Sequence, residues 1–266
     1  MKTADLESRM RALEYFHSIR ALPGAWVVLR VDGRSFTRLT QTDFEKPFDA
    51  RFHGLMMTAA EALLTGLDGL YAYTESDEIS LLLPRETSLF DRELEKLVSV
   101  SAGIASATFT HALGAPAHFD CRMWMAPDAG DVIDYFRWRQ ADAARCGLNG
   151  WCYWTLVKEG ATAAEATKRL KGTTAAQKNE LLFARGINFN DVPVWQRRGA
   201  GVLRETYERP GVDPRTSSAT VAVRRRVRRD ENLPLGEDYA AFLNALLHVA
   251  VAATAGDGPD RVHQTP

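Results

Sequence analysis

Three carboxylates are spaced so that a folded sheet would bring them together. Asp32 follows a short apolar run, and Asp77 and Glu78 lie in the polar break between two further apolar runs. Such runs predict buried strands, the second and third joined as a hairpin with an acidic tip. Oxygen ligands gathered at one sheet edge suit Mg²⁺, which takes one or two carboxylates together with waters and phosphates. Two such ions about 4 Å apart can activate an attacking oxygen and stabilise a leaving pyrophosphate.

The residues that follow Asp32 suit a triphosphate. Gly33 lets the backbone approach closely, so its carbonyl is a further candidate ligand for Mg²⁺. An arginine and a run of backbone N–H groups then predict a cradle for phosphates, formed by Arg34, Ser35, Phe36 and Thr37. Two alternatives stand beside this hypothesis: an Asp-Gly pair after a strand is commonly a turn, and an acidic hairpin tip is commonly solvated.

Other polar residues are placed where they could meet phosphate. Lys178 and Asn179 lie in the first turn of a helix predicted to open at Thr174, and a helix N-terminus attracts phosphate. Lys46 could reach a phosphate from a loop. The alternatives are a surface lysine on an ordinary capped helix and an exposed loop lysine.

Two arginine-containing segments are candidates for contact with an RNA backbone. Arg137 and Arg139 are interleaved with aromatic residues on a predicted helix and do not share one face. In a strand, Arg224, Arg226 and Arg228 would project from one face, which suits a row of phosphates and a salt-sensitive affinity. The alternatives are arginines that extend from a helix whose aromatic residues are in the core, and a charged strand edge that blocks aggregation.

The elements that must position these residues follow from hydrophobic periodicity and capping signals. In the first half the pattern predicts a helix over 6–20, a strand over 25–31, a helix over 49–65, a hairpin over 70–83, a helix from a capping box at 88–91 to about 113, and a strand over 118–125. This β-α-β-β-α-β order predicts an α+β fold with a split βαβ, ferredoxin-like antiparallel sheet, in which the first strand lies beside the hairpin.

The second half reads as a helical and β-hairpin extension. The pattern predicts helix over 128–158 with a break near Cys146-Gly147, capping boxes at 162–165 and 174–177 with the second helix ending at Gly186, strand from 195 to 207, a polar loop over 210–218, strand around 220–227 and a helix over 237–253. We expect a catalytic domain over 1–140, an extension over 141–253 packed on it as one compact unit, and a disordered tail over 254–266.

Composition limits the class of protein. The chain has 266 residues, of which 45% are apolar and 25% charged, the mixture of a soluble globular protein of one large or two small domains. A net charge of −1 excludes bulk attraction to nucleic acid or membranes, so such binding needs a local patch. Three cysteines without metal-site spacing argue against a disulfide framework or structural zinc and fit the cytoplasm. Neither a signal peptide nor a membrane span is predicted.

Several motifs in order resemble the tRNA-His guanylyltransferase family. The resemblance runs from about residue 6 to about residue 235. The motifs read Val31-Asp-Gly-Arg-Ser-Phe36, Glu45-Lys-Pro-Phe-Asp49, Tyr73-Thr-Glu-Ser-Asp-Glu78, Trp138-Arg-Gln-Ala-Asp142, Leu170-Lys-Gly-Thr173, Lys178-Asn-Glu-Leu-Leu-Phe183 and Gly186-Ile-Asn-Phe-Asn190. The resemblance implies a palm domain like that of polymerases, two Mg²⁺ ions, ATP, GTP or other nucleoside triphosphates as substrates, tRNA as partner and a homotetramer. It implies that Asp32, the Gly33 carbonyl and Asp77 hold Mg²⁺, that Glu78 assists, and that Asp32–Thr37 with Ser76 contact the triphosphate. It also favours phosphate contacts for Lys46, Lys178 and Asn179.

One stretch departs from the family pattern. Members dedicated to tRNA-His carry His-Ile-Asn-Asn-Leu-Tyr-Asn after the Trp-Arg-Gln-Ala-Asp motif, whereas residues 144–150 here read Ala-Arg-Cys-Gly-Leu-Asn-Gly. In this respect the chain resembles the Thg1-like branch, which implies repair of truncated tRNA 5′ ends. We therefore expect a template-dependent 3′–5′ nucleotidyltransferase that activates the 5′ phosphate with ATP or GTP. The alternatives are a guanylyltransferase that adds a single G to tRNA-His, a non-catalytic nucleotide- or RNA-binding protein, and a nucleotide cyclase.

Overall fold

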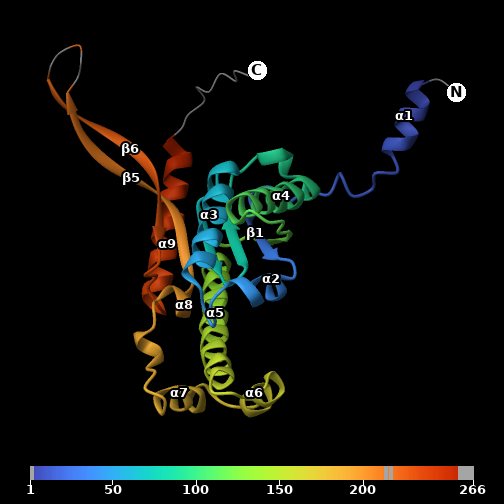
Figure 1. The fold of residues 1–266 in the computed structure, drawn as a ribbon. Coiled ribbons are helices and arrows are strands. Elements are labelled where there is room, and N and C mark those ends of the chain that lie inside the picture. The colour runs from blue at the N-terminus through green and yellow to red at the C-terminus, as the bar shows by residue number, and fades with distance from the viewer. Residues whose placement is uncertain (1–2, 213–214, 216–217, 257–266) are drawn as a thin grey trace.

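The structure is a computed structural model that describes residues 3–212, 215 and 218–256. The elements alternate between helices and strands along the first half of the chain (Figure 1). In chain order they are α1 Thr3–Arg11, β1 Trp26–Gly33, α2 Phe36–Asp43, α3 Ala50–Gly66, β2 Tyr71–Glu75, β3 Glu78–Leu82, the 3₁₀ turn η1 Leu89–Arg92, α4 Leu94–Leu113, β4 Phe119–Ala126, α5 Ala129–Lys158, α6 Ala163–Leu170, α7 Ala175–Phe183, the 3₁₀ turn η2 Phe189–Asp191, α8 Trp195–Arg198, β5 Ala200–Val212, β6 Ala219–Asp230 and α9 Glu237–Gly256.

The strands form one antiparallel sheet in the order β4-β1-β3-β2-β5-β6. Strand β1 lies between β3 and β4, so it is a central strand, and its continuous apolar run fits burial on both faces. The predicted strands and hairpin of the first half are present, in the predicted β-α-β-β-α-β order. The mixed fold with an antiparallel sheet and helices is therefore confirmed.

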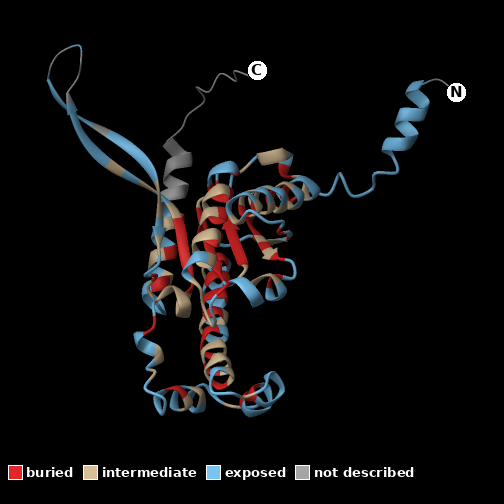
Figure 2. Cartoon of the chain, in the orientation of Figure 1, coloured by how far each residue is buried: buried red, intermediate tan, exposed pale blue. Residues whose placement is uncertain are grey.

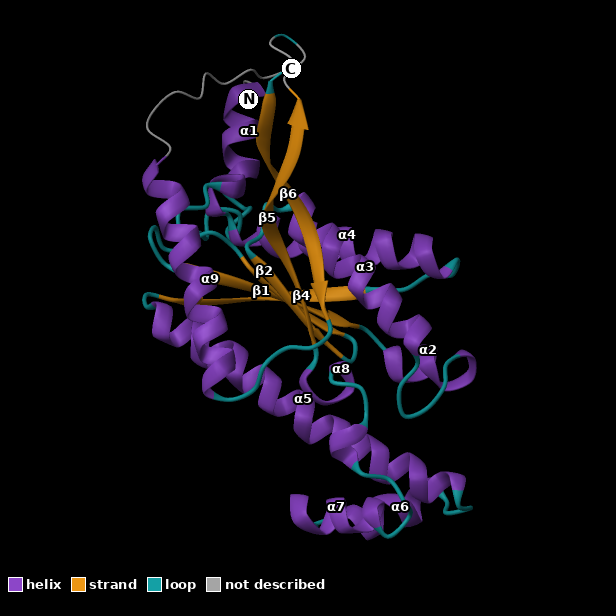
Figure 3. Ribbon diagram, turned by 90° about the vertical axis from the view of Figure 1, so that its left-hand side faces the viewer, coloured by secondary structure: helices purple, strands orange, loops and turns teal. Residues whose placement is uncertain are grey.

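Helices cover both faces of the sheet. One face packs against α3 and α4 in a core that includes Val27, Leu29 and Val31 of β1, and the other face packs against α5 and α9 around Trp26 and Val28. In Figure 2 the buried residues follow these layers and continue down the inner side of α5. Beyond the sheet, the far half of α5 packs against α6 and α7, which lie at its foot (Figures 1 and 3).

Helix α5 is continuous over 30 residues, so the predicted break near Cys146-Gly147 is wrong. The glycine serves packing instead. A Cβ at Gly147 would lie 2.4 Å from the carbonyl oxygen of Gln196, because the backbone of α8 passes directly over this position. Glycine in the middle of a helix here allows close approach of a neighbouring segment rather than a helix end.

The predicted helix over 6–20 is only partly formed. Helix α1 ends at Arg11, and the chain continues in turns to an isolated bridge between Arg20 and Glu93. None of the residues in α1 is buried, and the segment extends away from the sheet (Figure 1). The apolar side chains of residues 6–17 therefore pack against no core formed by the described residues, and Leu6, Met10, Leu13 and Phe16 are exposed.

The predicted capping box at residues 88–91 is wrong. Ser88 makes no side-chain cap hydrogen bond and precedes a 3₁₀ turn in which Phe90 and Asp91 have positive φ values of 50° and 53°. This turn interrupts the helical path, so α4 begins at Leu94 with Glu93 as its N-cap.

The second half agrees with the pattern at its caps and differs at several boundaries. Thr162 and Thr174 both form the predicted capping boxes. Helix α7 ends at Phe183, earlier than Gly186, and residues 195–198 form the short helix α8 instead of a strand. Strand β5 continues through the start of the predicted polar loop to Val212. Helix α9 ends at Gly256, so most of the predicted tail, residues 257–266, lies outside the described residues. Within the described part of the chain, no helix combines the length and apolarity needed to cross a bilayer.

Candidate nucleotide and metal site

The end of β1 meets the turn between β2 and β3. Asp32 lies directly opposite Glu78 in the antiparallel pairing of β1 and β3, and the N–H of Gly33 donates to the Asp77 carbonyl at 3.0 Å. Directly opposed residues have Cβ atoms about 5 Å apart. The structure thus brings Asp32, Asp77 and Glu78 to one end of the sheet, as the strand order predicts.

The turn that carries Asp77 is tightly held. Ser76 adopts a left-handed backbone with φ 48°, and its hydroxyl donates to the Asp77 carboxylate at 3.1 Å. The Thr74 hydroxyl donates to the Glu78 carbonyl at 2.9 Å and closes the hairpin. Burial raises the pKa of Asp77, and the neighbouring Asp32 carboxylate raises it further. The Asp32 and Asp77 carboxylates therefore repel each other when both are ionised.

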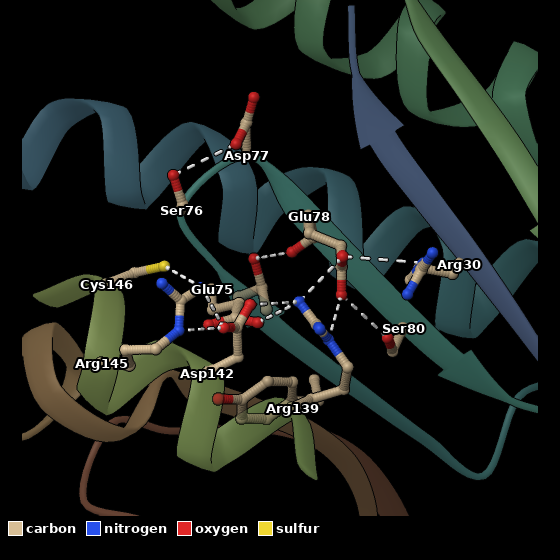
Figure 4. A network of polar contacts seen from close by, with 12 residues as sticks. Arg30, Glu75, Ser76, Asp77, Glu78, Ser80, Arg139, Asp142, Arg145 and Cys146 are labelled. Atoms are coloured by element: carbon tan, nitrogen blue, oxygen red, sulfur yellow. Dashed lines mark hydrogen bonds and ion pairs between the residues drawn. The ribbon is translucent and has the colours of Figure 1, made fainter. Parts of the chain in front are cut away.

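Glu75 and Glu78 both form ion pairs with Arg139, a buried arginine. The guanidinium of Arg139 on α5 donates to Glu78 at 2.8 and 3.0 Å and to Glu75 at 2.5 Å. All three side chains are almost fully buried. Burial raises the pKa of Glu75 to about 8 and that of Glu78 in the same direction, while Arg139 opposes both shifts. In Figure 4 this cluster lies on one side of the turn, and the Asp77 carboxylate points away from it.

The four carboxylates are therefore divided into two pairs with different partners. Arg139 pairs with Glu75 and Glu78, and Arg30 also pairs with Glu78 at 3.7 Å, whereas Asp32 and Asp77 have no arginine or lysine ion pair among the described residues. No group of three or more His, Cys, Asp or Glu side chains in the described part of the chain forms a metal cluster. Two carboxylates and a nearby backbone carbonyl nevertheless match the small protein donor set that Mg²⁺ uses when phosphates and waters complete its shell. The donor set fits Mg²⁺, because a cation would relieve the repulsion between Asp32 and Asp77.

Helix α2 begins directly after this carboxylate pair. A Cβ at Gly33 would lie 2.6 Å from the ring of Phe36, so only glycine lets the strand turn into the helix here. Ser35, the N-cap, has a left-handed backbone with φ 62° and makes no side-chain cap hydrogen bond. The first N–H groups of a helix have no intrahelical partner, and they favour an anion. The structure thus places a helix N-terminus close to Asp32, and its use as a phosphate cradle stays a prediction.

A cavity of about 500 Å³ opens beside the turn and α2. Five of the residues predicted to contact a nucleotide line it: Phe36, Thr37, Lys46, Ser76 and Asp77. The ammonium group of Lys46 donates to the Thr40 hydroxyl at 2.7 Å, and burial lowers its pKa. The cavity is within the size range of small-molecule sites and has polar groups at one end.

Several other residues that line this cavity were not predicted as site residues. The imidazole of His53 stacks on Trp195 with ring centroids 4.1 Å apart, and Tyr153 and Trp154 reach the cavity from α5. Asp49 also lines it and caps α3 by accepting from the N–H groups of Arg51 and Phe52. Aromatic walls suit a nucleobase, which has a π face. Asp49 lies within a motif quoted above, whereas His53, Tyr153, Trp154 and Trp195 lie outside the motifs and join the cavity through long-range packing.

The remaining predicted residues lie elsewhere. Lys178 and Asn179 are on α7 at the foot of α5 and do not line the cavity (Figure 1). Arg137 is partly exposed and donates to Glu237 at 3.0 Å. Arg139 is buried and holds carboxylates, so it is removed from the RNA-binding residues. Arg224, Arg226 and Arg228 lie on β6, in a hairpin that extends beyond the sheet (Figure 1).

Family models match nearly the whole chain. Residues 7–127 match the model described as tRNAHis guanylyltransferase, and residues 130–236 match the Thg1 C terminal domain. The chain belongs to the tRNAHis guanylyltransferase family. This is a family of nucleotidyltransferase enzymes, so the predicted enzyme class and family are confirmed.

Curated relatives agree with this assignment. A probable tRNA(His) guanylyltransferase of Drosophila melanogaster is 37% identical over 69% of this chain and 68% of the relative. One from Dictyostelium discoideum is 38% identical over 70% of this chain and 78% of the relative. The tRNA(His) guanylyltransferase of Schizosaccharomyces pombe is 34% identical over 76% of this chain and 82% of the relative.

Solved structures of the family have the same fold. A bacterial tRNA(His) guanylyltransferase (Thg1)-like protein in complex with GTP has a TM-score of 0.70 at 25% identity, and the match covers 92% of this chain and 99% of that protein. A complex with ATP has a TM-score of 0.73 at the same identity, covering 91% and 98%. The tRNA(His) guanylyltransferase from Saccharomyces cerevisiae has a TM-score of 0.66 at 29% identity, covering 71% and 90%.

Proposed function

We propose that this protein is a Mg²⁺-dependent nucleotidyltransferase that adds a guanosine to the 5′ end of tRNA(His). The observation that carries the proposal is the unpaired Asp32–Asp77 couple beside a cavity large enough for a nucleoside triphosphate, in a chain of this family. The names of the curated relatives support this single addition, which was the alternative reading of the sequence, better than general 5′-end repair. On this proposal β1–β4 and their helices serve as a polymerase-like palm.

The reaction we propose has two transfers. The 5′ phosphate of the tRNA attacks the α-phosphorus of ATP and releases pyrophosphate; the 3′-hydroxyl of GTP then attacks the activated 5′ phosphate and releases AMP. The N-terminus of α2 and Lys46 would hold the triphosphate, and the aromatic walls of the cavity would hold the base. Asp32, Asp77 and the Gly33 carbonyl would hold two Mg²⁺ ions, which neutralise phosphate charge when bound. Arg139 would keep Glu75 and Glu78 in place on either side of the turn.

Template-dependent repair of truncated tRNAs is the second candidate. The chain lacks the histidine-led stretch of the tRNA-His-specific members at residues 144–150, and the bacterial Thg1-like structures match it over nearly their full length. Both candidates need the same site and differ in the tRNA that is accepted. We expect action in the cytoplasm, where tRNA and nucleotides are available, and the family favours a homotetramer.

One experiment separates the candidates. The purified protein is incubated with Mg²⁺, ATP and labelled nucleoside triphosphates, and with tRNA(His) lacking its −1 guanosine or with other tRNAs lacking their first nucleotide. Addition of G to tRNA(His) alone supports the first candidate, whereas addition that copies the facing base on all truncated tRNAs supports the second. Absence of any addition, with nucleotide binding intact, would leave a binding protein and reject both.

A further inference from the structure

A second cavity of about 690 Å³ lies on the opposite side of α2. Residues 37, 40 and 41 face the first cavity, residues 35, 38, 39 and 42 face the second, and Phe44, just beyond the end of the helix, lines both. Spacings of three and four place each set on one side of the helix. The second cavity is closed by the loop between α4 and β4, which contributes Ala115, Pro116, Ala117 and His118.

The lining of this cavity carries positive charge that no carboxylate among the described residues pairs with. Three arginines line it, Arg34, Arg38 and Arg51, against one acidic residue, Asp43. None of these arginines forms an ion pair with a carboxylate among the described residues, in contrast to Arg139 and Arg226. Arg51 donates to the Asp43 carbonyl at 2.5 Å and lies over the ring of Phe44 at 4.5 Å. An arginine cluster of this kind suits phosphate oxygens.

The second cavity begins next to the carboxylate pair. Arg34 is two residues from Asp32, a span of at most about 7 Å in an extended chain. The N–H of Arg34 donates to the carbonyl of His118 at 2.8 Å, which fixes the cavity wall to the start of β4. A phosphate held here would therefore lie close to a phosphate held at Asp32 and the N-terminus of α2.

The two cavities differ in what they can hold. The first has stacked aromatic walls and few cations, which suits a nucleoside triphosphate with its base. The second has three arginines; its aromatic groups are the ring of Phe44, which is buried and lies under Arg51, and the exposed imidazole of His118. It therefore suits phosphates without base stacking, as in an RNA backbone.

We propose that the second cavity binds backbone phosphates of the tRNA strand at its 5′ end, while the first cavity holds the nucleoside triphosphate. This inference rests on the proposed function and assigns Arg38 and Arg51 as contacts of the RNA. With this arrangement the 5′ phosphate of the RNA and the triphosphate approach Asp32 from opposite sides of α2.

The test measures binding without turnover. Affinity for tRNA(His) lacking its −1 nucleotide is determined over a series of salt concentrations for the wild type, Arg38→Ala, Arg38→Lys and Arg51→Ala, and GTP affinity is determined without RNA. Arg38→Ala should weaken tRNA binding about fivefold near 0.15 M salt and reduce the salt slope by about one, because one phosphate contact is lost. Arg38→Lys keeps the charge and should recover most of the affinity. Arg9→Ala, on the exposed helix α1 that extends away from the sheet, is the control and should change neither value.

Arg38 is exposed and has no side-chain partner within the described residues, so its loss should leave folding intact. Unchanged tRNA affinity and salt slope in both alanine variants would overturn the proposal. A loss of GTP affinity with tRNA binding unchanged would also overturn it, since the cavity would then hold nucleotide phosphates. Failure of the proposed function is seen separately, as absence of nucleotide addition by the wild type.

Discussion

At the residue scale, the site depends on which carboxylates are left without a protein cation. Glu75 and Glu78 lie on either side of the turn and share Arg139, while Asp77 between them points away from this cluster. Asp77 lies near enough to Asp32 for the Asp32 carboxylate to raise its pKa. We therefore propose different roles for these acidic residues: Glu75 and Glu78 fix the turn, and Asp32 and Asp77 are available for a cation. A charge that is buried without a partner reduces stability, and such charges commonly mark functional positions.

This division predicts that Asp77→Asn separates stability from activity. Because burial and Asp32 raise the pKa of Asp77, its ionised form costs folding free energy at neutral pH, and the neutral amide should raise the melting temperature measured without Mg²⁺. Nucleotide addition should fall by a factor of about 100 or more. Added Mg²⁺ should stabilise the wild type but not the variant.

The control for this measurement is Asp131→Asn, which changes an exposed carboxylate in the first turn of α5. It should keep both activity and the response to Mg²⁺. An equal Mg²⁺-induced shift in melting temperature for the wild type and Asp77→Asn would remove Asp77 from the metal ligands.

A second residue-scale prediction concerns His53 and pH. Burial lowers the pKa of His53 below 6.5, nearby Arg229 acts in the same direction, and Glu231 at 3.1 Å opposes it. The unfolded chain then binds more protons, so the stability associated with neutral His53 is present above pH 6.5 and is lost as the pH falls through the folded-state value. His53→Gln should reduce the fall in unfolding free energy between neutral and mildly acid pH, by at most about 1.4 kcal/mol per pH unit.

Chemical denaturation over a pH series measures this. His118→Gln, an exposed position, should behave as the wild type, and an imidazole titration above 6.5 in the folded protein would contradict the prediction.

At the element scale, α5 organises the site from behind the sheet. Its first half supplies Arg139 to the acidic turn, and further along it supplies Tyr153 and Trp154 to the cavity and receives α8 at Gly147. The helix therefore links the turn, the aromatic wall and the segment that carries Trp195. Its continuity, which the sequence pattern did not predict, is what allows one element to do this.

Two glycines of α5 offer a matched test of this packing. Gly147→Ala places a Cβ 2.4 Å from the Gln196 carbonyl oxygen, so α8 must shift, and we expect a loss of about 1–3 kcal/mol in unfolding free energy. At Gly150 the nearest neighbour of a new Cβ is Pro47 at 3.9 Å, and alanine should instead stabilise the helix by up to about 1 kcal/mol. The melting temperatures of Gly147→Ala and Gly150→Ala, measured by thermal unfolding, test this expectation. Similar melting temperatures for the two variants would show that α8 does not need this close approach.

The elements also show what the sequence alone can predict. The convergence of Asp32 and Asp77 follows from two local signals, an apolar strand and a hairpin, together with the usual order of a split βαβ sheet. The role of Arg139 depends on how α5 docks on the sheet, and no local pattern contains that information. Gly147 was read as a helix end because its contact partner, Gln196, lies 49 positions along the chain. Residues 12–17 fit a helical pattern but have no core, and periodicity is not sufficient without packing.

At the scale of the whole molecule, charge that could meet RNA is spread far beyond the site. Strand β5 pairs with β2 only from Ala200 to Leu203, and after that it pairs with β6 alone, so the rest of the hairpin is a two-stranded arm (Figures 1 and 3). Arg224 and Arg226 of the basic row lie on this arm, and Arg228 lies at its base, opposite Leu203. Helices α6 and α7 lie at the opposite end, and the cavities lie between them. A small ligand would touch only the centre, whereas a folded RNA can span all three regions.

The arginines of the arm are not equivalent, and this gives the last prediction. Arg226 and Arg228 both pair with Glu205, and Arg228 also pairs with Asp230 at 3.0 Å. Arg224 lies opposite Tyr207, is exposed, and has no carboxylate partner within the described residues. A paired arginine has already lost much of its capacity to attract phosphate, because a carboxylate neutralises it, whereas an unpaired one releases a counterion when RNA binds.

Arg224→Ala should therefore weaken tRNA binding about fivefold near 0.15 M salt and lower the salt slope by about one, while Arg228→Ala should have a smaller effect on both. GTP affinity should be unchanged in both variants, since the arm is remote from the cavity that we assign to the nucleotide. A larger loss of tRNA affinity for Arg228→Ala than for Arg224→Ala would indicate that the arm acts through its internal ion pairs and the shape they maintain, and not as a direct contact with phosphate.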